Sequence, residues 1–221
     1  MKSVLTLGST SVLLDEVDKA LEARSYSFAR YADDCNVYVG SRRAGERVMA
    51  YIRKLYTGLK LQINEAKSAV ASAFGRKFLG YEFWMAKGKE VKCAVAYKAL
   101  DNFKARIRQL TRRSGGRSMA QVVEKLRPCV LGWKAYFGMS QTPRIWRELD
   151  EWLRHRLRAI QLKHWKRPRA IYRELKALGA SEDVANQVAG NCHRWCRNSD
   201  GVIKRVLTIA YFDRLGVPRL S

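Results

Sequence analysis

Residues 28–39 constrain the fold more than any other stretch, because two short β-forming segments flank a pair of aspartates. The stretch reads F-A-R-Y-A-D-D-C-N-V-Y-V and predicts strands over Tyr26–Tyr31 and Cys35–Val39, joined through Ala32-Asp33-Asp34. Asp favours turns because its side chain bonds the local backbone, so such a pair is often a plain solvated turn. Hydrophobic flanks favour a hairpin buried enough to hold two like charges together, which is costly without a cation. The pair is therefore a candidate divalent-metal site.

The rest of the first 96 residues predicts a mixture of helices and strands. Helical periodicity covers Val12–Ala23 and Ala44–Leu59. Strands are predicted over the segments Lys60–Ile63, Ser68–Ala73, Lys77–Trp84 and Val91–Val95, with a turn at Gly88-Lys89. We therefore expect an α+β first domain, residues 1–96.

From Tyr97 onward the pattern becomes entirely helical. Expected helices run over Tyr97–Arg113, from a capping box at Ser118 to Phe137, from Thr142-Pro143 to about Lys166, and over about 169–178 and 181–196. In the longest helix an apolar stripe predicts the buried face: Ile145, Leu149, Leu153, Leu157 and Ile160. The second domain is thus predicted to span residues 97–221.

The charge of the chain favours a polyanionic partner. The 221 residues carry a formal net charge of +23 with a pI near 10.2, which favours nucleic acid ahead of an anionic membrane. Residues 1–90 hold 15 Lys/Arg against 10 Asp/Glu, whereas residues 91–221 hold 28 against 10. No apolar run approaches the roughly 20 residues of a membrane-spanning helix, and no signal peptide is apparent. Five scattered cysteines predict reduced thiols in a cytoplasmic protein.

Two basic clusters are candidate nucleic-acid contacts, one around Ser114-Gly115-Gly116 and one in the segment 164–169, H-W-K-R-P-R. A single Arg on a helix is usually just solvated, but the aggregate charge exceeds what solubility requires. The predicted RNA-binding residues are Arg106, Arg108, Arg112, Arg113, Arg117, Lys134, Arg154, Arg158, Lys163, Lys166, Arg167 and Arg169. Trp133, Tyr136 and Phe137 are expected in the helical core rather than stacked on bases.

The segment C-H-R-W-C, residues 192–196, suggests a zinc site but is one ligand short. We expect no zinc, and we interpret Cys192 and Cys196 as buried thiols one helical turn apart.

Four ordered blocks resemble one protein family. Y-A-D-D between two strands resembles the palm-domain catalytic hairpin of reverse transcriptases. G-L-K-L-Q-I-N-E-A-K-S (58–68) and K-F-L-G-Y-E-F (77–83) are similar to the next two blocks, the second being the primer-grip region. L-R-P-C-V-L-G-W-K-A-Y-F (126–137) resembles the signature of the group II intron maturase region. Over about residues 12–165 the chain thus resembles a group II intron-encoded reverse transcriptase/maturase.

The resemblance implies roles for particular residues. Asp33 would be the main carboxylate ligand of Mg²⁺, and Asp34 would support the metal or orient the primer end. The other residues implied in the nucleotide and primer region are Tyr31, Ala32, Lys67, Phe78, Leu79 and Gly80. For Lys67, a plain surface lysine is an equally good interpretation. For Gly80, a β-bulge without a functional role is equally good.

The resemblance is incomplete in one respect. The family supplies another essential Asp from an upstream strand, followed by a P-Q-G segment, and neither is found here. Asp15 and Asp18 lie on a predicted helix and are expected to be surface charges. We therefore expect an N-terminally truncated chain with little polymerase activity alone, completed by a missing N-terminal segment or a dimer partner.

The implied fold is a partial palm over 1–96 and an all-helical thumb/maturase domain over 97–221. The implied function is RNA-directed DNA synthesis together with binding of structured intron RNA and an RNA/DNA duplex. The alternative is a non-catalytic RNA-binding splicing module. A DNA-binding or endonuclease role ranks third, because nothing here resembles the Cys/His-rich nuclease module of some family members.

Overall fold

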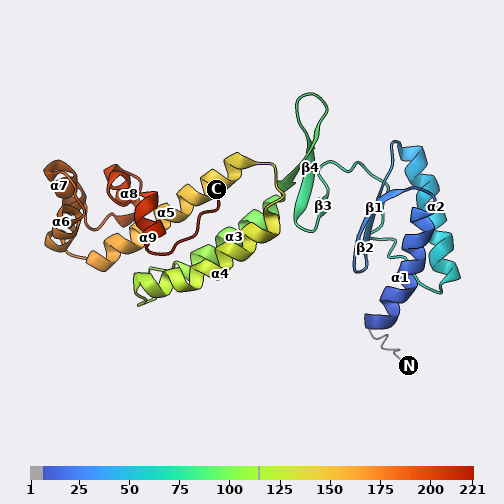
Figure 1. The fold of residues 1–221 in the computed structure, drawn as a ribbon, viewed down its shortest axis with the longest axis horizontal. Coiled ribbons are helices and arrows are strands. Elements are labelled where there is room, and N and C mark those ends of the chain that lie inside the picture. The colour runs from blue at the N-terminus through green and yellow to red at the C-terminus, as the bar shows by residue number, and fades with distance from the viewer. Residues whose placement is uncertain (1–6, 114) are drawn as a thin grey trace. The chain divides into compact units, whose positions relative to one another are not determined.

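The computed structural model describes residues 7–113 and 115–221, and the chain folds into two compact units (Figure 1). The N-terminal unit extends to Arg76 and the C-terminal unit runs from Lys77 to Ser221. The mixture of helices and antiparallel strands agrees with the expected α+β class. The boundary expected near residue 96, between a palm region and a thumb region, stays a prediction.

The N-terminal unit combines two helices with one β-hairpin. Its elements are α1 (Leu7–Glu22), β1 (Ser27–Tyr31), β2 (Asp34–Tyr38) and α2 (Arg42–Gly58). The side chains of Leu14, Val17 and Leu21 on α1 are buried, as the periodicity of the helix requires. The two helices pack together while α1 contacts β1 and α2 contacts β2, so the helices support the hairpin.

Two strands expected in this unit do not form. Lys60, at a φ of 56°, follows the last turn of α2, and the Leu61 amide bonds back to the carbonyl of Tyr56 (2.8 Å). Residues 61–64 and 68–72 have no regular secondary structure, and a turn lies between them. β1 and β2 pair with each other in this unit, and neither segment joins them. Strand propensity alone does not fix a strand without a ladder partner.

The C-terminal unit begins with a three-stranded antiparallel sheet of order β3-β4-β5, formed by β3 (Lys77–Phe78), β4 (Tyr81–Met85) and β5 (Val91–Val95). The single strand expected over Lys77–Trp84 is thus two strands joined by a turn. Leu79 and Gly80 occupy this turn with φ of 53° and 79°, as the tight turns of β-hairpins require. The turn expected at Gly88-Lys89 is confirmed.

Helices form the rest of this unit. They are α3 (Tyr97–Leu110), α4 (Met119–Phe137), α5 (Pro143–Trp165), α6 (Pro168–Ala177), α7 (Glu182–Gly190), α8 (Trp195–Asn198), the 3₁₀ helix η1 (Val202–Arg205) and α9 (Ile209–Arg214). The capping box at Ser118 is confirmed, and Pro143 begins α5 as expected. Thr142 makes no side-chain cap, because its hydroxyl bonds that of Ser140 (2.7 Å). The helix expected over 181–196 ends at Gly190.

Three helices, α3, α4 and α5, form much of the core of this unit, and α6, α7, η1 and α9 continue it. Apolar side chains on all three helices are fully buried, as at Ile107, Leu126 and Leu157. Aromatic rings extend the core: the ring centroid of Trp133 lies 4.3 Å from that of Phe103 and 4.9 Å from that of Phe137.

Tyr136 differs from its neighbours in this core. Its side chain is 53% exposed, so the prediction that it is buried is wrong, whereas Trp133 and Phe137 pack inside as expected.

Within the part of the chain that the structure describes, no helix has both the length and the apolar character needed to cross a membrane.

Candidate metal hairpin and nucleic-acid interface

The two aspartates lie where the predicted hairpin places them. The register pairs Tyr31 with Asp34, so Ala32 and Asp33 form a two-residue loop and Asp34 is the first residue of β2. Ala32 has a φ of 50°, an uncommon value for a residue with a Cβ. Both aspartates are exposed, as are Tyr31 and Ala32, so the expectation of a hairpin buried around the two like charges is wrong.

These carboxylates make an incomplete metal site by themselves. Over residues 7–113 and 115–221, no three His, Cys, Asp or Glu side chains form a group able to hold a metal ion. Mg²⁺ prefers octahedral oxygen coordination and usually keeps several waters. Asp33 and Asp34 fit this oxygen donor set, but a two-metal site also needs carboxylates from elsewhere.

Asp15 and Asp18 do not supply those carboxylates. Asp15 is exposed and pairs with Lys19 (2.8 Å), as expected of a surface charge. Asp18 is not one, because its carboxylate is only 19% exposed and accepts the Nε hydrogen of Arg30 on β1 (2.8 Å). This ion pair joins α1 to the hairpin. Beside it, burial raises the pKa of the Cys35 thiol, and the charge of Asp18 adds to the effect.

The remaining nucleotide- and primer-region residues fall into both units. Lys67 is exposed in the N-terminal unit, and its amide bonds the carbonyl of Asn64 (3.0 Å). Phe78, Leu79 and Gly80 belong to the C-terminal unit. There the Tyr136 hydroxyl donates to the Leu79 carbonyl (3.0 Å).

Gly80 is a turn residue rather than a β-bulge. A Cβ at this position would lie 3.0 Å from Cζ of Phe137, so the glycine allows the hairpin to approach α4 closely. The primer-holding role of this turn stays a prediction.

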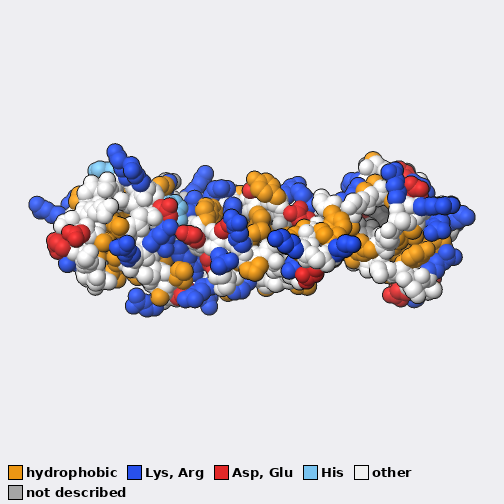
Figure 2. All heavy atoms as spheres, turned by 90° about the horizontal axis from the view of Figure 1, so that it is seen from above, with side chains coloured by type: hydrophobic (Ala, Val, Ile, Leu, Met, Phe, Trp, Pro, Cys, Tyr) orange, Lys and Arg blue, Asp and Glu red, His pale blue; other side chains and the backbone are white. Residues whose placement is uncertain are grey.

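Most of the predicted RNA-binding residues are accessible. Figure 2 shows Lys and Arg side chains spread along the visible face of the helical unit. The exposed members of the set are Arg106, Arg108, Arg112, Arg113, Lys166, Arg167 and Arg169. Lys134 and Lys163 are half-buried because they donate to the backbone carbonyls of Arg219 (3.1 Å) and Arg113 (2.7 Å). Arg117 is half-buried too.

Arg154 and Arg158 correct the prediction, because both are buried structural residues. Arg154 is 1% exposed and donates to the carboxylate of Asp150 (2.6 Å), with Asp213 at 3.4 Å. Arg158 is 4% exposed and donates through Nε to the carbonyl of Leu207 (2.9 Å), and burial lowers the pKa of its guanidinium. Their side chains face the interior, where RNA has no access in this fold.

Cys192 and Cys196 also differ from the expectation. Cys192 is buried in the turn after α7, and Cys196 is exposed on α8, so the two thiols do not share one helix. The prediction of two buried thiols one turn apart is wrong for Cys196.

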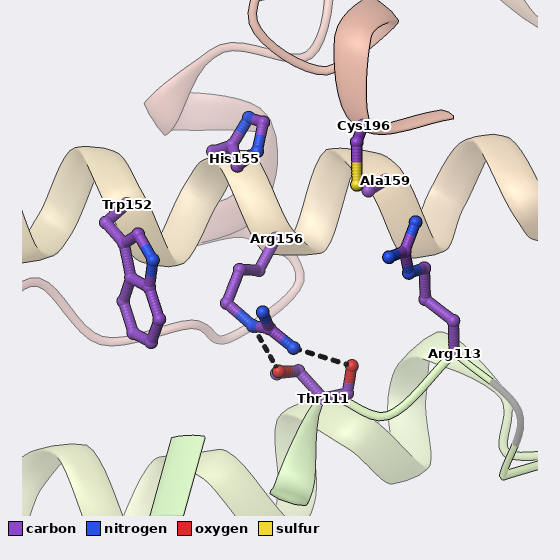
Figure 3. Close-up of a pocket in the computed structure, with 7 residues that line it drawn as sticks. All are labelled: Thr111, Arg113, Trp152, His155, Arg156, Ala159 and Cys196. Atoms are coloured by element: carbon purple, nitrogen blue, oxygen red, sulfur yellow. Dashed lines mark hydrogen bonds between the residues drawn. The ribbon is translucent and has the colours of Figure 1, made fainter. Parts of the chain in front are cut away.

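A cavity of about 180 Å³ is the feature that sequence reasoning missed (Figure 3). It lies between the end of α3, the middle of α5 and α8, and its lining residues are Thr111, Arg113, Trp152, His155, Arg156, Ala159 and Cys196. Arg156 donates through Nε to the Thr111 hydroxyl (2.7 Å) and through Nη2 to the Thr111 carbonyl (3.4 Å). Burial, together with the charges of Arg108 and Arg113, lowers the pKa of the Arg156 guanidinium.

Comparison with known families finds a match for part of the C-terminal unit. The family model of the group II intron maturase-specific domain matches residues 100–179, which extend from α3 through α6. Among curated proteins, no sequence matches the chain. A maturase-specific domain implies binding to intron RNA, and the matched residues include the basic α3 and α5. The sequence resemblance to this region is thereby confirmed: residues 100–179 match the maturase-specific domain of group II intron proteins.

Proposed function

We propose that the chain binds structured group II intron RNA through its C-terminal unit and assists folding and splicing of that RNA. The observation that carries the proposal is the match of the maturase-specific domain to residues 100–179, within the strongly basic part of the chain. Phosphate contacts dominate the affinity of basic proteins for nucleic acid and make it fall with salt.

The exposed arginines on α3 and after it suit backbone contacts. Arg106, Arg108, Arg112 and Arg113 are solvent-accessible, and within the described residues none of them forms an ion pair with a carboxylate. RNA is recognised largely by shape, phosphate and 2′-hydroxyl contacts, which guanidiniums without a carboxylate partner make without a change of fold.

Binding and splicing assays test this function. The purified chain is titrated with a group II intron RNA and with a scrambled RNA of equal length, each at several salt concentrations. We expect tighter binding of the intron, a steep loss of affinity with salt, and faster splicing at limiting Mg²⁺. Equal affinity for both RNAs with no effect on splicing would overturn the maturase role.

A second candidate is RNA-directed DNA synthesis, which the geometry of the aspartate hairpin favours. In this proposal residues 1–96 are a partial palm and residues 97–221 a thumb/maturase region that holds an RNA/DNA duplex. Asp33 and Asp34 would hold Mg²⁺, which supplies charge stabilisation for phosphoryl transfer when bound. Lys67 would lie near the nucleotide and Phe78–Gly80 along the primer.

Primer extension tests this candidate. Since no third carboxylate joins the pair among the described residues, we expect little extension by the chain alone and recovery when a segment with the upstream Asp and P-Q-G blocks is added. Asp33→Asn should abolish the recovered activity, whereas Asp15→Asn should not. Robust extension by the chain alone would refute the need for a second carboxylate source.

A further inference from the structure

We propose that the cavity between α3, α5 and α8 is a receptor for a single phosphate group of the RNA backbone, anchored on Arg156 and Arg113. The inference rests on the proposed RNA-binding function and assigns one contact point within it.

The first argument is uncompensated charge. Burial lowers the pKa of the Arg156 guanidinium, and the nearby charges of Arg108 and Arg113 lower it further. Among the described residues, no acidic side chain lines the cavity. Across the described residues, no carboxylate forms an ion pair with any of these three arginines. Bringing like charges together in a half-buried site is unfavourable unless an anion binds there.

Arg154 lies two residues before Arg156 on α5 and has a purely structural role, so its contacts provide a comparison for those of Arg156. That side chain meets the carboxylates of Asp150 and Asp213 at 2.6 and 3.4 Å. Arg156 has the carbonyl and hydroxyl of Thr111 instead, which are neutral groups. The protein thus supplies counter-charge to one arginine and none to the other, so the counter-charge for Arg156 is left to a ligand.

The second argument is preorganisation. Thr111 is 1% exposed, and its two oxygens accept two of the five N–H donors of Arg156. The guanidinium is thereby fixed with three donors left, and a fixed fork of donors suits a phosphate. The ring of Trp152 lies 5.5 Å from Cζ of Arg156 and 5.6 Å from Cζ of Arg108, distances at which the ring attracts both cations. Trp152 therefore holds two of the arginines in place.

The third argument is size. The cavity of about 180 Å³ is close to the roughly 150 Å³ that accommodates a benzene ring, and smaller than the roughly 300 Å³ at which pockets for drug-sized ligands begin. A cavity of this volume accommodates one phosphate group. A phosphate on a continuous strand is the ligand that matches both the size and the charge.

Charge-removing variants test the receptor. Arg113→Gln removes an exposed guanidinium and leaves the core intact, and Arg156→Gln removes the fixed one. Arg147→Gln is the matched control, since Arg147 is exposed on the same helix and lies outside the cavity. Each cavity variant should weaken binding of intron RNA about tenfold, the effect of losing a hydrogen bond to a charged group. It should also lower the slope of log affinity against log salt by about 0.7–0.9.

A conservative variant separates charge from geometry. Arg156→Lys keeps the positive charge but loses the planar fork, so it should retain the salt slope yet bind RNA more weakly than wild type. Tryptophan fluorescence melting of each variant checks that the unit remains folded.

The unaltered protein offers an independent measurement, because the exposed Cys196 thiol lies on the cavity wall. Bound RNA should slow alkylation of Cys196 by iodoacetamide severalfold, and high salt should restore the rate. Inorganic phosphate is the second probe: protection by micromolar phosphate but not by RNA would assign the site to a free anion and overturn the proposal.

The outcomes distinguish this proposal from the function on which it rests. If wild type binds intron RNA but the cavity variants match Arg147→Gln and Cys196 stays reactive, the receptor alone is refuted. If wild type does not bind the RNA at all, the maturase function fails and the receptor with it.

Discussion

Replacing Asp150 with asparagine should destabilise the C-terminal unit strongly. Asp150 is 5% exposed and its carboxylate accepts hydrogen bonds from the Arg154 guanidinium (2.6 Å) and from the amides of Leu220 (3.0 Å) and Ser221 (2.8 Å). The side chain therefore neutralises a fully buried cation and also fixes the last residues of the chain against α5.

The size of the effect follows from these contacts. Breaking a buried ion pair costs about 3–5 kcal/mol, because the remaining charge is left uncompensated. Asp213 at 3.4 Å and the carbonyl of Pro218 at 3.3 Å still face Arg154, and asparagine keeps one acceptor, so the lower end of this range applies. A loss of about 3 kcal/mol corresponds to a fall in Tm of about 6–12 °C for a chain of this size.

Tryptophan fluorescence measures this change in the right unit. All six tryptophans, from Trp84 to Trp195, lie in the C-terminal unit, so the fluorescence signal does not report unfolding of the N-terminal unit. Glu148→Gln is the control: it lies on the same helix, is exposed and pairs with Arg144 (2.7 Å), a contact worth at most about 1 kcal/mol. If Asp150→Asn melts within about 1 °C of this control, the carboxylate does not neutralise Arg154 as we infer.

Three further predictions concern turns, charge and pH. Gly80→Ala should destabilise the C-terminal unit more than Gly88→Ala in fluorescence melting. Both glycines have a positive φ, which costs alanine about 1–2 kcal/mol, but only the Cβ added at position 80 would lie 3.0 Å from an aromatic ring. Equal losses would exclude that contact. Asp18→Asn should speed amide exchange in β1, because its arginine partner loses its counter-charge, whereas Asp15→Asn should not; identical exchange in both would contradict this role. Two arginines hold the pKa of Asp213 below its ordinary 3.8, so its stabilising contribution is present above that pH and lost as pH falls through the lower folded value. Asp213→Asn should therefore reduce the acid dependence of the melting temperature below about pH 4, and an unchanged acid limb would refute the linkage.

Local sequence signals predicted the parts of the fold that depend on neighbouring residues. The aspartate hairpin, the capping box at Ser118 and the start of α5 at Pro143 were all apparent, because turn and cap chemistry acts over a few residues. The strands expected over 60–63 and 68–73 failed because a strand also needs a partner elsewhere in the chain.

Burial of charge was the part that sequence could not predict. Helical periodicity identified one apolar stripe on α5, but this helix also packs against α6 and α8 and forms polar contacts with η1, α9 and Leu220. The groups that accept from Arg154 and Arg158 include Asp213 and the Leu207 carbonyl, 59 and 49 residues away. The sequence did not predict the cavity for the same reason, because Thr111, Arg156 and Cys196 are brought together only by packing.

The two-residue loop of the aspartate hairpin also sets the register of β2, the strand that follows it. Because Tyr31 pairs directly with Asp34, adding one residue to the loop would shift β2 by one position and turn each of its side chains to the opposite face. Cys35 and Val37 would then exchange faces with Asn36 and Tyr38. The aspartates can thus change identity at little structural cost, whereas the length of this loop cannot change without rebuilding the hairpin.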